Sequence, residues 1–122
     1  MACWIARFRI IICIYIVRYE WDEDKNRRNQ RKHGGISFEL ATLVFEDERC
    51  LVYMDRVDER TGEQRWIALG MAEPAVDAVI LLVVAHVYRE DEYGQEIIRI
   101  ISARQAEKRD IRRYQEQALD EE

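Results

Sequence analysis

The second half of the chain consists of short apolar runs separated by turn-forming residues. Four runs have the β-branched content of strands, at residues 50–55, 65–69, 79–88 and 96–103. Thr61-Gly62 and Tyr93-Gly94 mark turns within residues 58–64 and 90–95. Residues 72–77 surround Pro74, the only proline, and are predicted to form a loop. These short connections predict a four-stranded antiparallel meander.

Amphipathic segments on either side of the meander predict helices. Apolar residues recur at three- to four-residue spacing after Ser37, which caps a predicted helix of residues 38–46. A C-terminal helix is predicted over residues 107–117. With the polar segment described next, the pattern predicts an α+β domain, in which two N-terminal helices and a C-terminal helix lie on one side of an antiparallel sheet.

Residues 22–35 have the start and stop signals of a helix but no apolar side chain to bury. Asp22 is a favourable N-cap, and Gly34-Gly35 supply a stop. Positions 23–32 contain no apolar residue, so burial contributes little to the stability of this helix. The segment is either a solvated surface helix or a helix that faces phosphate, with Lys25, Asn29 and Lys32 on one side.

Residues 10–17 form an uninterrupted apolar run. A membrane-spanning helix needs about 20 apolar residues, whereas Arg7, Arg9 and Arg18 bound this run. No small-residue cleavage site follows it, as a signal peptide requires. The β-branched content favours a buried or edge strand. A membrane or signal segment, and an upstream mis-start of a reading frame that begins at Val17, are the alternatives.

The chain length and charge predict one acidic domain with basic regions. The 122 residues correspond to a single domain, predicted over residues 17–117, followed by an acidic tail at 118–122. Nineteen basic and 24 acidic residues give a net charge of −5, which argues against a nucleic-acid binder. However, basic residues concentrate in residues 25–33 and 99–113. An acidic total can therefore hide a basic face, unless both regions are merely solvated.

Cysteine and histidine residues offer little support for metal chemistry. Cys3, Cys13 and Cys50 are odd in number and widely spaced, as expected of ordinary thiols in a reducing cytoplasm. His86 lies within an apolar run, so a core position is expected, whereas His33 is predicted to lie outside the sheet. Histidine is the residue type whose ordinary pKa is close to neutral pH. We predict no cofactor and no metal. The cations suit metal-free phosphodiester chemistry, because arginine can brace a phosphate.

Five short motifs, taken in order along the chain, carry a family resemblance. They are Trp21-Asp22-x-x-Lys25-x-x-x-Asn29-x-x-Lys32-His33-Gly34, Ile36-Ser37-Phe38-Glu39-x-Ala41, Val44-Phe45-x-Asp47, Arg65-Trp66-x-x-x-Gly70 and Arg99-Ile100-Ile101-Ser102-Ala103-Arg104. In order and spacing, the chain resembles the BrnT family of bacterial toxins over about residues 17–114. Two departures are the second glycine at Gly35 and residues 1–16, which have no counterpart in the family pattern.

The resemblance implies a small ribonuclease toxin with a RelE-like α+β fold, acting in the cytoplasm to inhibit translation and growth. It also implies a ribbon-helix-helix antitoxin as partner, in a complex that represses its own promoter. Operator DNA would be contacted through the antitoxin and not by this chain. The alternatives are an inactive module that only binds the antitoxin and a plain interaction domain.

The resemblance also implies site residues. The predicted catalytic residues are Lys25, Lys32, His33, Arg65 and Arg104. The predicted substrate-binding residues are Asn29, Arg89 and Arg99. In this hypothesis the RNA 2′-hydroxyl attacks its own phosphate. His33 or Lys32 transfers protons, and the scissile phosphate is held by Arg65, Arg89 and Arg104.

Overall fold

The computed structural model describes residues 17–120 of the chain. The predicted strand within residues 10–16 lies outside the described residues, as do Cys3, Cys13 and residues 121–122 of the acidic tail. The described elements are, in order, β1 (Arg18–Glu20), α2 (Glu23–Lys32), α3 (Phe38–Ala41), the 3₁₀ helix η1 (Thr42–Glu46), β2 (Leu51–Val57), β3 (Gln64–Ala75), β4 (Ala78–Glu90), β5 (Glu96–Gln105) and α4 (Lys108–Asp120).

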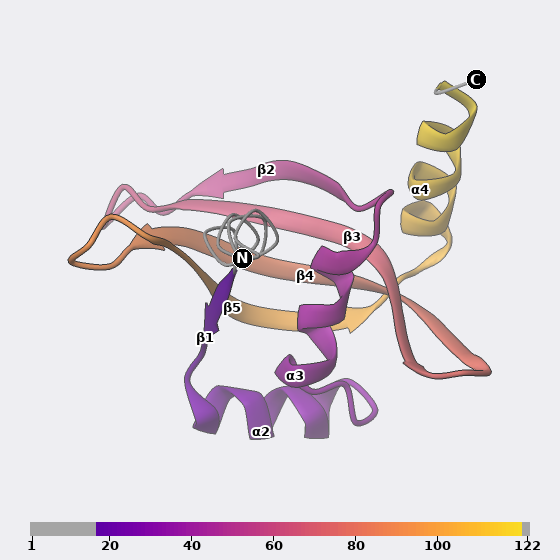
Figure 1. Cartoon of the computed structure of the whole chain (residues 1–122), viewed down its shortest axis with the longest axis horizontal. Helices are drawn as coiled ribbons and strands as arrows, with labels where there is room; N and C mark the ends of the chain where they lie inside the picture. The colour runs from indigo at the N-terminus through magenta and orange to yellow at the C-terminus, as the bar shows by residue number, and fades with distance from the viewer. Residues whose placement is uncertain (1–16, 121–122) are drawn as a thin grey trace, which may run out of the picture.

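The α+β class and the antiparallel meander are confirmed, but the sheet is larger than predicted. Its strand order is β1-β5-β4-β3-β2, and β2 to β5 pair antiparallel as expected (Figure 1). The prediction of a purely antiparallel sheet is wrong, because β1 pairs parallel to β5, with Arg18 opposite Ile97. This strand also precedes both N-terminal helices. Three residues are too few to leave a period-2 pattern in the sequence.

The predicted loop at residues 72–77 is also wrong. β3 continues to Ala75 and β4 begins at Ala78, so residues 72–75 belong to a strand, in which Ala72 pairs with Ile80 and Ala75 with Ala78. The pairing of β2 with β3 extends only to Leu69, which leaves the last part of β3 at an edge of the sheet. Proline is tolerated at such an edge and at register irregularities, and one occurs between Ala72 and Ala75, around Pro74.

Each strand presents alternate residues to two faces of the sheet. The covered face carries Ala68, Ala72, Leu82 and Val84, which pack against α3 and η1 in the main core. The predicted helix of residues 38–46 is split, because α3 tightens into η1 after Ala41. Side-chain alternation places Ile67, Leu69 and Val83 on the opposite side, here called the open face.

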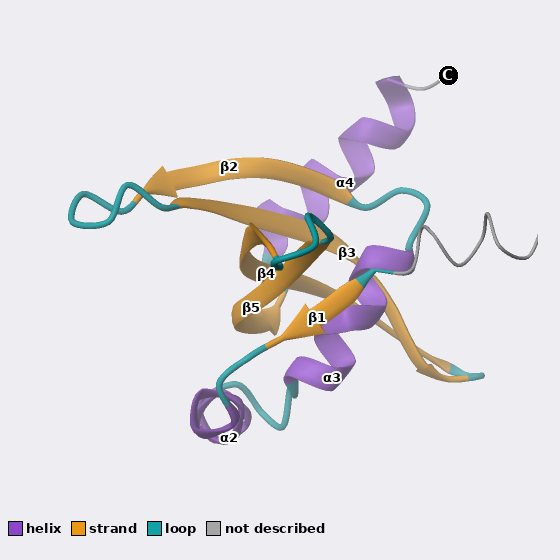
Figure 2. Ribbon diagram, turned by 60° about the vertical axis from the view of Figure 1, so that its left-hand side comes forward, coloured by secondary structure: helices purple, strands orange, loops and turns teal. Residues whose placement is uncertain are grey.

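The prediction that all helices lie on one side of the sheet is wrong. α3 lies on the covered face, whereas α4 lies against the open face (Figure 2). Two hydrogen bonds tie α4 to residues that follow η1. The Tyr114 hydroxyl donates to Asp47 at 2.6 Å, and Gln117 donates to the Arg49 carbonyl. These bonds join α4 to the segment between η1 and β2.

Candidate active site

The polar helix α2 is anchored to the fold by two buried asparagines. It begins at the predicted N-cap, where Asp22 accepts hydrogen bonds from the backbone N–H groups of Asp24 and Lys25. Asn26 is 1% exposed, and its Oδ1 accepts from the Phe38 N–H at 2.8 Å. Its Nδ2 donates to Glu39 at 2.9 Å, so the amide joins α2 to the start of α3.

The side-chain amide of Asn29 pairs with the backbone of β5, as a neighbouring strand would. Its Nδ2 donates to the carbonyls of Ala103 at 2.7 Å and Ile36 at 3.0 Å, and its Oδ1 accepts from the Ala103 N–H at 3.2 Å. The amide thus satisfies both backbone groups of a residue that β1 does not reach. Asn29 holds α2 in place, and its predicted substrate contact stays a prediction.

The cations of α2 line a hollow at this edge. We call it the helix hollow; it has a volume of about 280 Å³ and is lined by Lys25, Arg28, Asn29, Lys32, His33, Ile101 and Ser102. It brings together three of the five predicted catalytic residues. Sequence reasoning missed the part played by β5, whose register shift between Ala85 and His86 leaves Ile101 as an extra residue beside α2.

A second hollow lies on the open face under α4. This arginine hollow has a volume of about 280 Å³ and is lined by Tyr53, Asp55, Ile67, Val83, Arg104, Arg109, Asp110 and Arg113. Of the predicted catalytic residues it contains Arg104. The contributions of β2 and α4 were missed, although Arg109 and Arg113 have the i, i+4 spacing that places two side chains on one side of a helix.

Arg104 is held by a buried carboxylate. Its Nη1 donates to Asp110 Oδ2 at 2.9 Å and to the Gln105 carbonyl at 3.1 Å. Asp110 is 4% exposed and also accepts from the Glu107 N–H at 2.9 Å. Burial opposes ionisation of Asp110, but this N–H and the Arg104 guanidinium outweigh it and lower the pKa of the carboxyl. Asp110 therefore stays charged and fixes the direction of Arg104.

The two hollows meet on β5. Ser102 lines the helix hollow and Arg104 lines the arginine hollow, and these residues lie two apart on one face of the strand. Two residues along a strand span roughly 7 Å, which is about the distance between successive phosphates of an extended RNA strand. A single RNA segment can therefore reach both groups of cations.

Arg65 lies on the open face but lines neither hollow. Trp66 pairs with His86, so Arg65 stands across from Val87, which is 1% exposed. The Nε atom of Arg65 is buried and has no hydrogen-bond partner within residues 17–120. A buried donor without a partner is costly, and the contact of Arg65 with the scissile phosphate stays a prediction.

Arg89 and Arg99 are both engaged by Glu20 of β1. Arg89 Nη2 lies 2.6 Å from Glu20 Oε1, and Arg99 Nη1 lies 2.9 Å from Glu20 Oε2. The hydrogen bond from Arg89 is the main cause of a lowered Glu20 pKa, with a further contribution from Arg99. Neither arginine lines either hollow, and their predicted contacts with substrate stay predictions.

His86 and Cys50 belong to the packing of the fold. His86 is fully buried, with its ring 4.9 Å from the ring centroids of both Phe45 and Tyr88. Burial lowers its pKa, and its Nε2 has no hydrogen-bond partner among the described residues. Burial also raises the pKa of Cys50 to about 11, so this thiol stays protonated at neutral pH.

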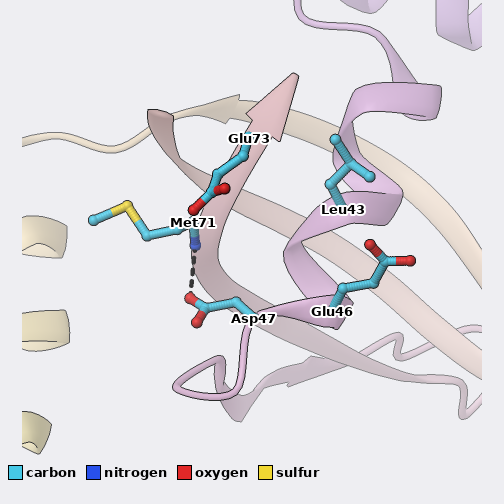
Figure 3. Close-up of a pocket in the computed structure, with 5 residues that line it drawn as sticks. All are labelled: Leu43, Glu46, Asp47, Met71 and Glu73. Atoms are coloured by element: carbon cyan, nitrogen blue, oxygen red, sulfur yellow. Dashed lines mark hydrogen bonds between the residues drawn. The ribbon is translucent and has the colours of Figure 1, made fainter. Parts of the chain in front are cut away.

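A third hollow, of about 310 Å³, is acidic. Figure 3 shows its lining residues: Leu43, Glu46, Asp47, Met71 and Glu73. The Asp47 carboxylate accepts from the Met71 N–H at 2.8 Å, in addition to the Tyr114 hydroxyl. Its carboxylates repel a polyanion, so this hollow is the least suited of the three to RNA.

Residues 17–120 contain neither a metal-binding cluster nor a membrane-spanning helix. No three residues among their His, Cys, Asp and Glu side chains form a group able to hold a metal ion. No helix between residues 17 and 120 is long and apolar enough to cross a membrane.

Comparison with known proteins gives one family. Residues 21–110 match the model of a family described as "Ribonuclease toxin, BrnT, of type II toxin-antitoxin system". A search of curated proteins found no match. The matched segment begins at Trp21, just before α2, and ends at Asp110, the residue that holds Arg104.

Proposed function

Since the chain belongs to the BrnT family of ribonuclease toxins of type II toxin–antitoxin systems, we propose that it cleaves RNA without a metal ion, at the junction of the helix and arginine hollows. The observation that supports this location most is the placement of Ser102 and Arg104 on adjacent outward positions of β5. This placement joins the cations of α2 to those of α4 along one strand.

The reaction proposed is attack by an RNA 2′-hydroxyl on its own phosphate. The O2′–P bond forms and the P–O5′ bond breaks, which leaves a 2′,3′-cyclic phosphate and a 5′-hydroxyl. His33 or Lys32, in the helix hollow, takes the 2′-hydroxyl proton or supplies one to the departing oxygen. Arg104, which lines the arginine hollow, stabilises the negative charge that develops on the phosphate, and Arg65, on the same face of the sheet, is the second predicted phosphate ligand.

The test is cleavage of a labelled RNA in excess EDTA, with analysis of the product ends. We expect full activity under chelation and products that carry a 2′,3′-cyclic phosphate and a 5′-hydroxyl. Loss of cleavage in EDTA with recovery on Mg²⁺ addition would contradict the mechanism. A chain that binds its partner but never cuts RNA would instead favour the inactive binding module.

The family also implies an antitoxin partner. We propose that this partner is a ribbon-helix-helix protein that covers the cations of α2 and α4, because blocking the approach to a cationic site is the most direct way to exclude RNA. Operator DNA would then be contacted through the antitoxin. Co-expression with the neighbouring reading frame, followed by cleavage and operator-binding assays on the purified complex, tests this. A stable complex that cuts RNA at the rate of the free chain would place the antitoxin elsewhere.

Growth inhibition is the expected consequence in cells. Induced expression of the active chain should stop growth and protein synthesis in the cytoplasm, and co-expressed antitoxin should restore both. If the chain cleaves RNA in vitro but leaves growth unchanged at equal expression, the proposed inhibition of translation is contradicted.

A further inference from the structure

The arginine hollow has a floor that a phosphate site does not need. Tyr53, Ile67 and Val83 come from three neighbouring strands of the open face and form a partly apolar surface beneath the arginines. A phosphate is fully hydrated and gains nothing from apolar contact. A nucleobase, by contrast, is flat and apolar on its two faces and polar at its edge.

The aromatic ring in this floor, Tyr53, is already stacked with a cation, Arg113. The Arg113 guanidinium carbon lies 3.8 Å from the centroid of the Tyr53 ring. Single-stranded RNA is commonly bound by stacking bases on aromatic rings or on guanidinium planes. A base can therefore extend this stack on Arg113, or replace Arg113 on the ring.

The hollow contains two negatively charged side chains. One of them, Asp55, forms no hydrogen bond or ion pair with the described residues. The other carboxylate, Asp110, is already occupied by Arg104 and the Glu107 N–H. A carboxylate only accepts hydrogen bonds. Guanine offers it two adjacent donors, N1–H and N2–H, whereas uracil offers a single N–H between two carbonyl oxygens that a carboxylate repels.

We propose that the arginine hollow binds one unpaired base of the RNA, with guanine preferred: the base stacks on the Tyr53–Arg113 pair, and Asp55 accepts from its Watson–Crick edge. This inference rests on the proposed RNA substrate and adds a specificity site to it. Arg104, on the β5 side of the hollow, then contacts the phosphate next to the bound base. The base is thereby placed one nucleotide from the helix hollow.

The experiment measures binding without cleavage. Two fluorescein-labelled 2′-O-methyl hexanucleotides, one of uridine only and one with a single central guanosine, cannot be cut because the 2′-oxygen is blocked. At fixed salt, fluorescence anisotropy should show the guanosine strand binding roughly tenfold more tightly to the wild-type chain. Equal affinity for the two strands, or no binding of either, would overturn the proposal.

Two variants separate the stack from the edge contact. Tyr53→Leu keeps apolar bulk and should weaken binding of both strands about tenfold. Asp55→Asn should weaken binding of the guanosine strand and slightly tighten binding of the uridine strand, because a negative charge beside the RNA is removed, so that the two affinities come within about twofold of each other. Two substitutions far from the hollow serve as matched controls. Tyr93→Leu changes a tyrosine that is 82% exposed in the turn between β4 and β5, and Asp77→Asn changes an exposed aspartate. Both controls should bind as the wild type does.

The variants also distinguish failure of this site from failure of the nuclease. Circular dichroism checks folding, and Arg113→Gln, at an exposed residue that lines the same hollow, replaces Tyr53→Leu if the latter does not fold. If the wild-type chain binds the guanosine strand selectively but cuts no unmodified RNA, the base site stands and the nuclease fails. If it cuts RNA with equal rates next to every base, or if both stacking variants bind like the wild type, the base site fails alone.

Discussion

The two faces of the sheet differ in how they use side chains. The covered face is filled by aliphatic and small residues that are almost completely buried, such as Ala68, Leu82 and Val84. The open face buries Val87 and Ile97 at 1% and 3% exposure, but arginines surround them. The long apolar stems of arginine cover such residues while the charged heads stay in water.

In the proposed function, this difference separates the residues that stabilise the fold from those that act on RNA. The packing that holds the fold together lies mainly on one side of the sheet, away from the proposed arginine hollow. The cations of the open face are fixed by a few carboxylates instead of by a core, as Asp110 fixes Arg104 and Glu20 fixes Arg99. Substitutions on the two faces should therefore affect different measurements.

The largest effect is expected on the open face. Arg104→Ala should lower the rate constant of RNA cleavage by about 10²–10³-fold, because a positioned donor acts most strongly on the charge of the transition state. Affinity for the blocked RNA should fall much less. The control is Arg31→Ala, an exposed cation of α2 that lines neither hollow. Equal loss of binding and cleavage would reduce Arg104 to a simple RNA contact.

The second effect tests whether α2 depends on its amides. Asn29→Ala removes three hydrogen bonds and leaves the backbone of Ala103 unpaired, which should lower the free energy of unfolding by about 2–4 kcal/mol. Urea unfolding measures it, and the neighbouring Arg31→Ala provides the baseline. A cost below about 0.5 kcal/mol would show that water replaces the amide.

The third effect concerns the close packing of η1 against β3 on the covered face. A Cβ on Gly70 would lie 3.0 Å from Val44 Cγ1 and 3.1 Å from the Val44 carbonyl oxygen. Gly70→Ala should therefore push η1 away from β3 and cost about 1–3 kcal/mol of unfolding free energy. Ala75→Ser, at an exposed position of the same strand, should cost little. An unchanged thermal midpoint for Gly70→Ala would mean that η1 shifts freely.

The smallest effect is a pH dependence from the covered face. The pKa of His86 is lowered by burial in the folded state. As the pH falls below about 6.5, the unfolded chain takes up the proton first, so stability decreases by at most about 1.4 kcal/mol per pH unit. His86→Phe should remove this part of the decrease between pH 7 and 5.5. The same slope in both proteins would assign it to other groups.

Local signals predicted much of the fold. Asp22 and the glycine pair bounded α2, and the turns at Thr61-Gly62 and Tyr93-Gly94 separated strands that do pair. Such features depend on neighbouring residues and are readable along the chain. β1 was missed because its partner, β5, lies far away in sequence. The end of β3 was missed for a different reason: Pro74 was taken as the sign of a loop, although Ala75 pairs with the nearby Ala78.

The candidate site was only partly predictable for the same reason as β1. Motif resemblance led to Lys25, Lys32 and His33, which do share a hollow. It also led to Asn29, but an amide in a polar helix looks the same in sequence whether it contacts a ligand or a backbone. Tyr53 and Asp55 were missed because no local pattern places a β2 residue beside α4.

The amide of Asn29 also decides where another polypeptide can extend the sheet. On the β5 side, the margin consists of a three-residue strand and one side-chain amide bound to Ala103. Such a margin offers no row of free backbone groups for an incoming strand. At the other margin β2 runs from Leu51 to Val57 with no neighbour on its outer side among the described residues. Within residues 17–120, the longest template for a protein that binds by strand addition is therefore the seven-residue strand β2, which carries Tyr53 and Asp55.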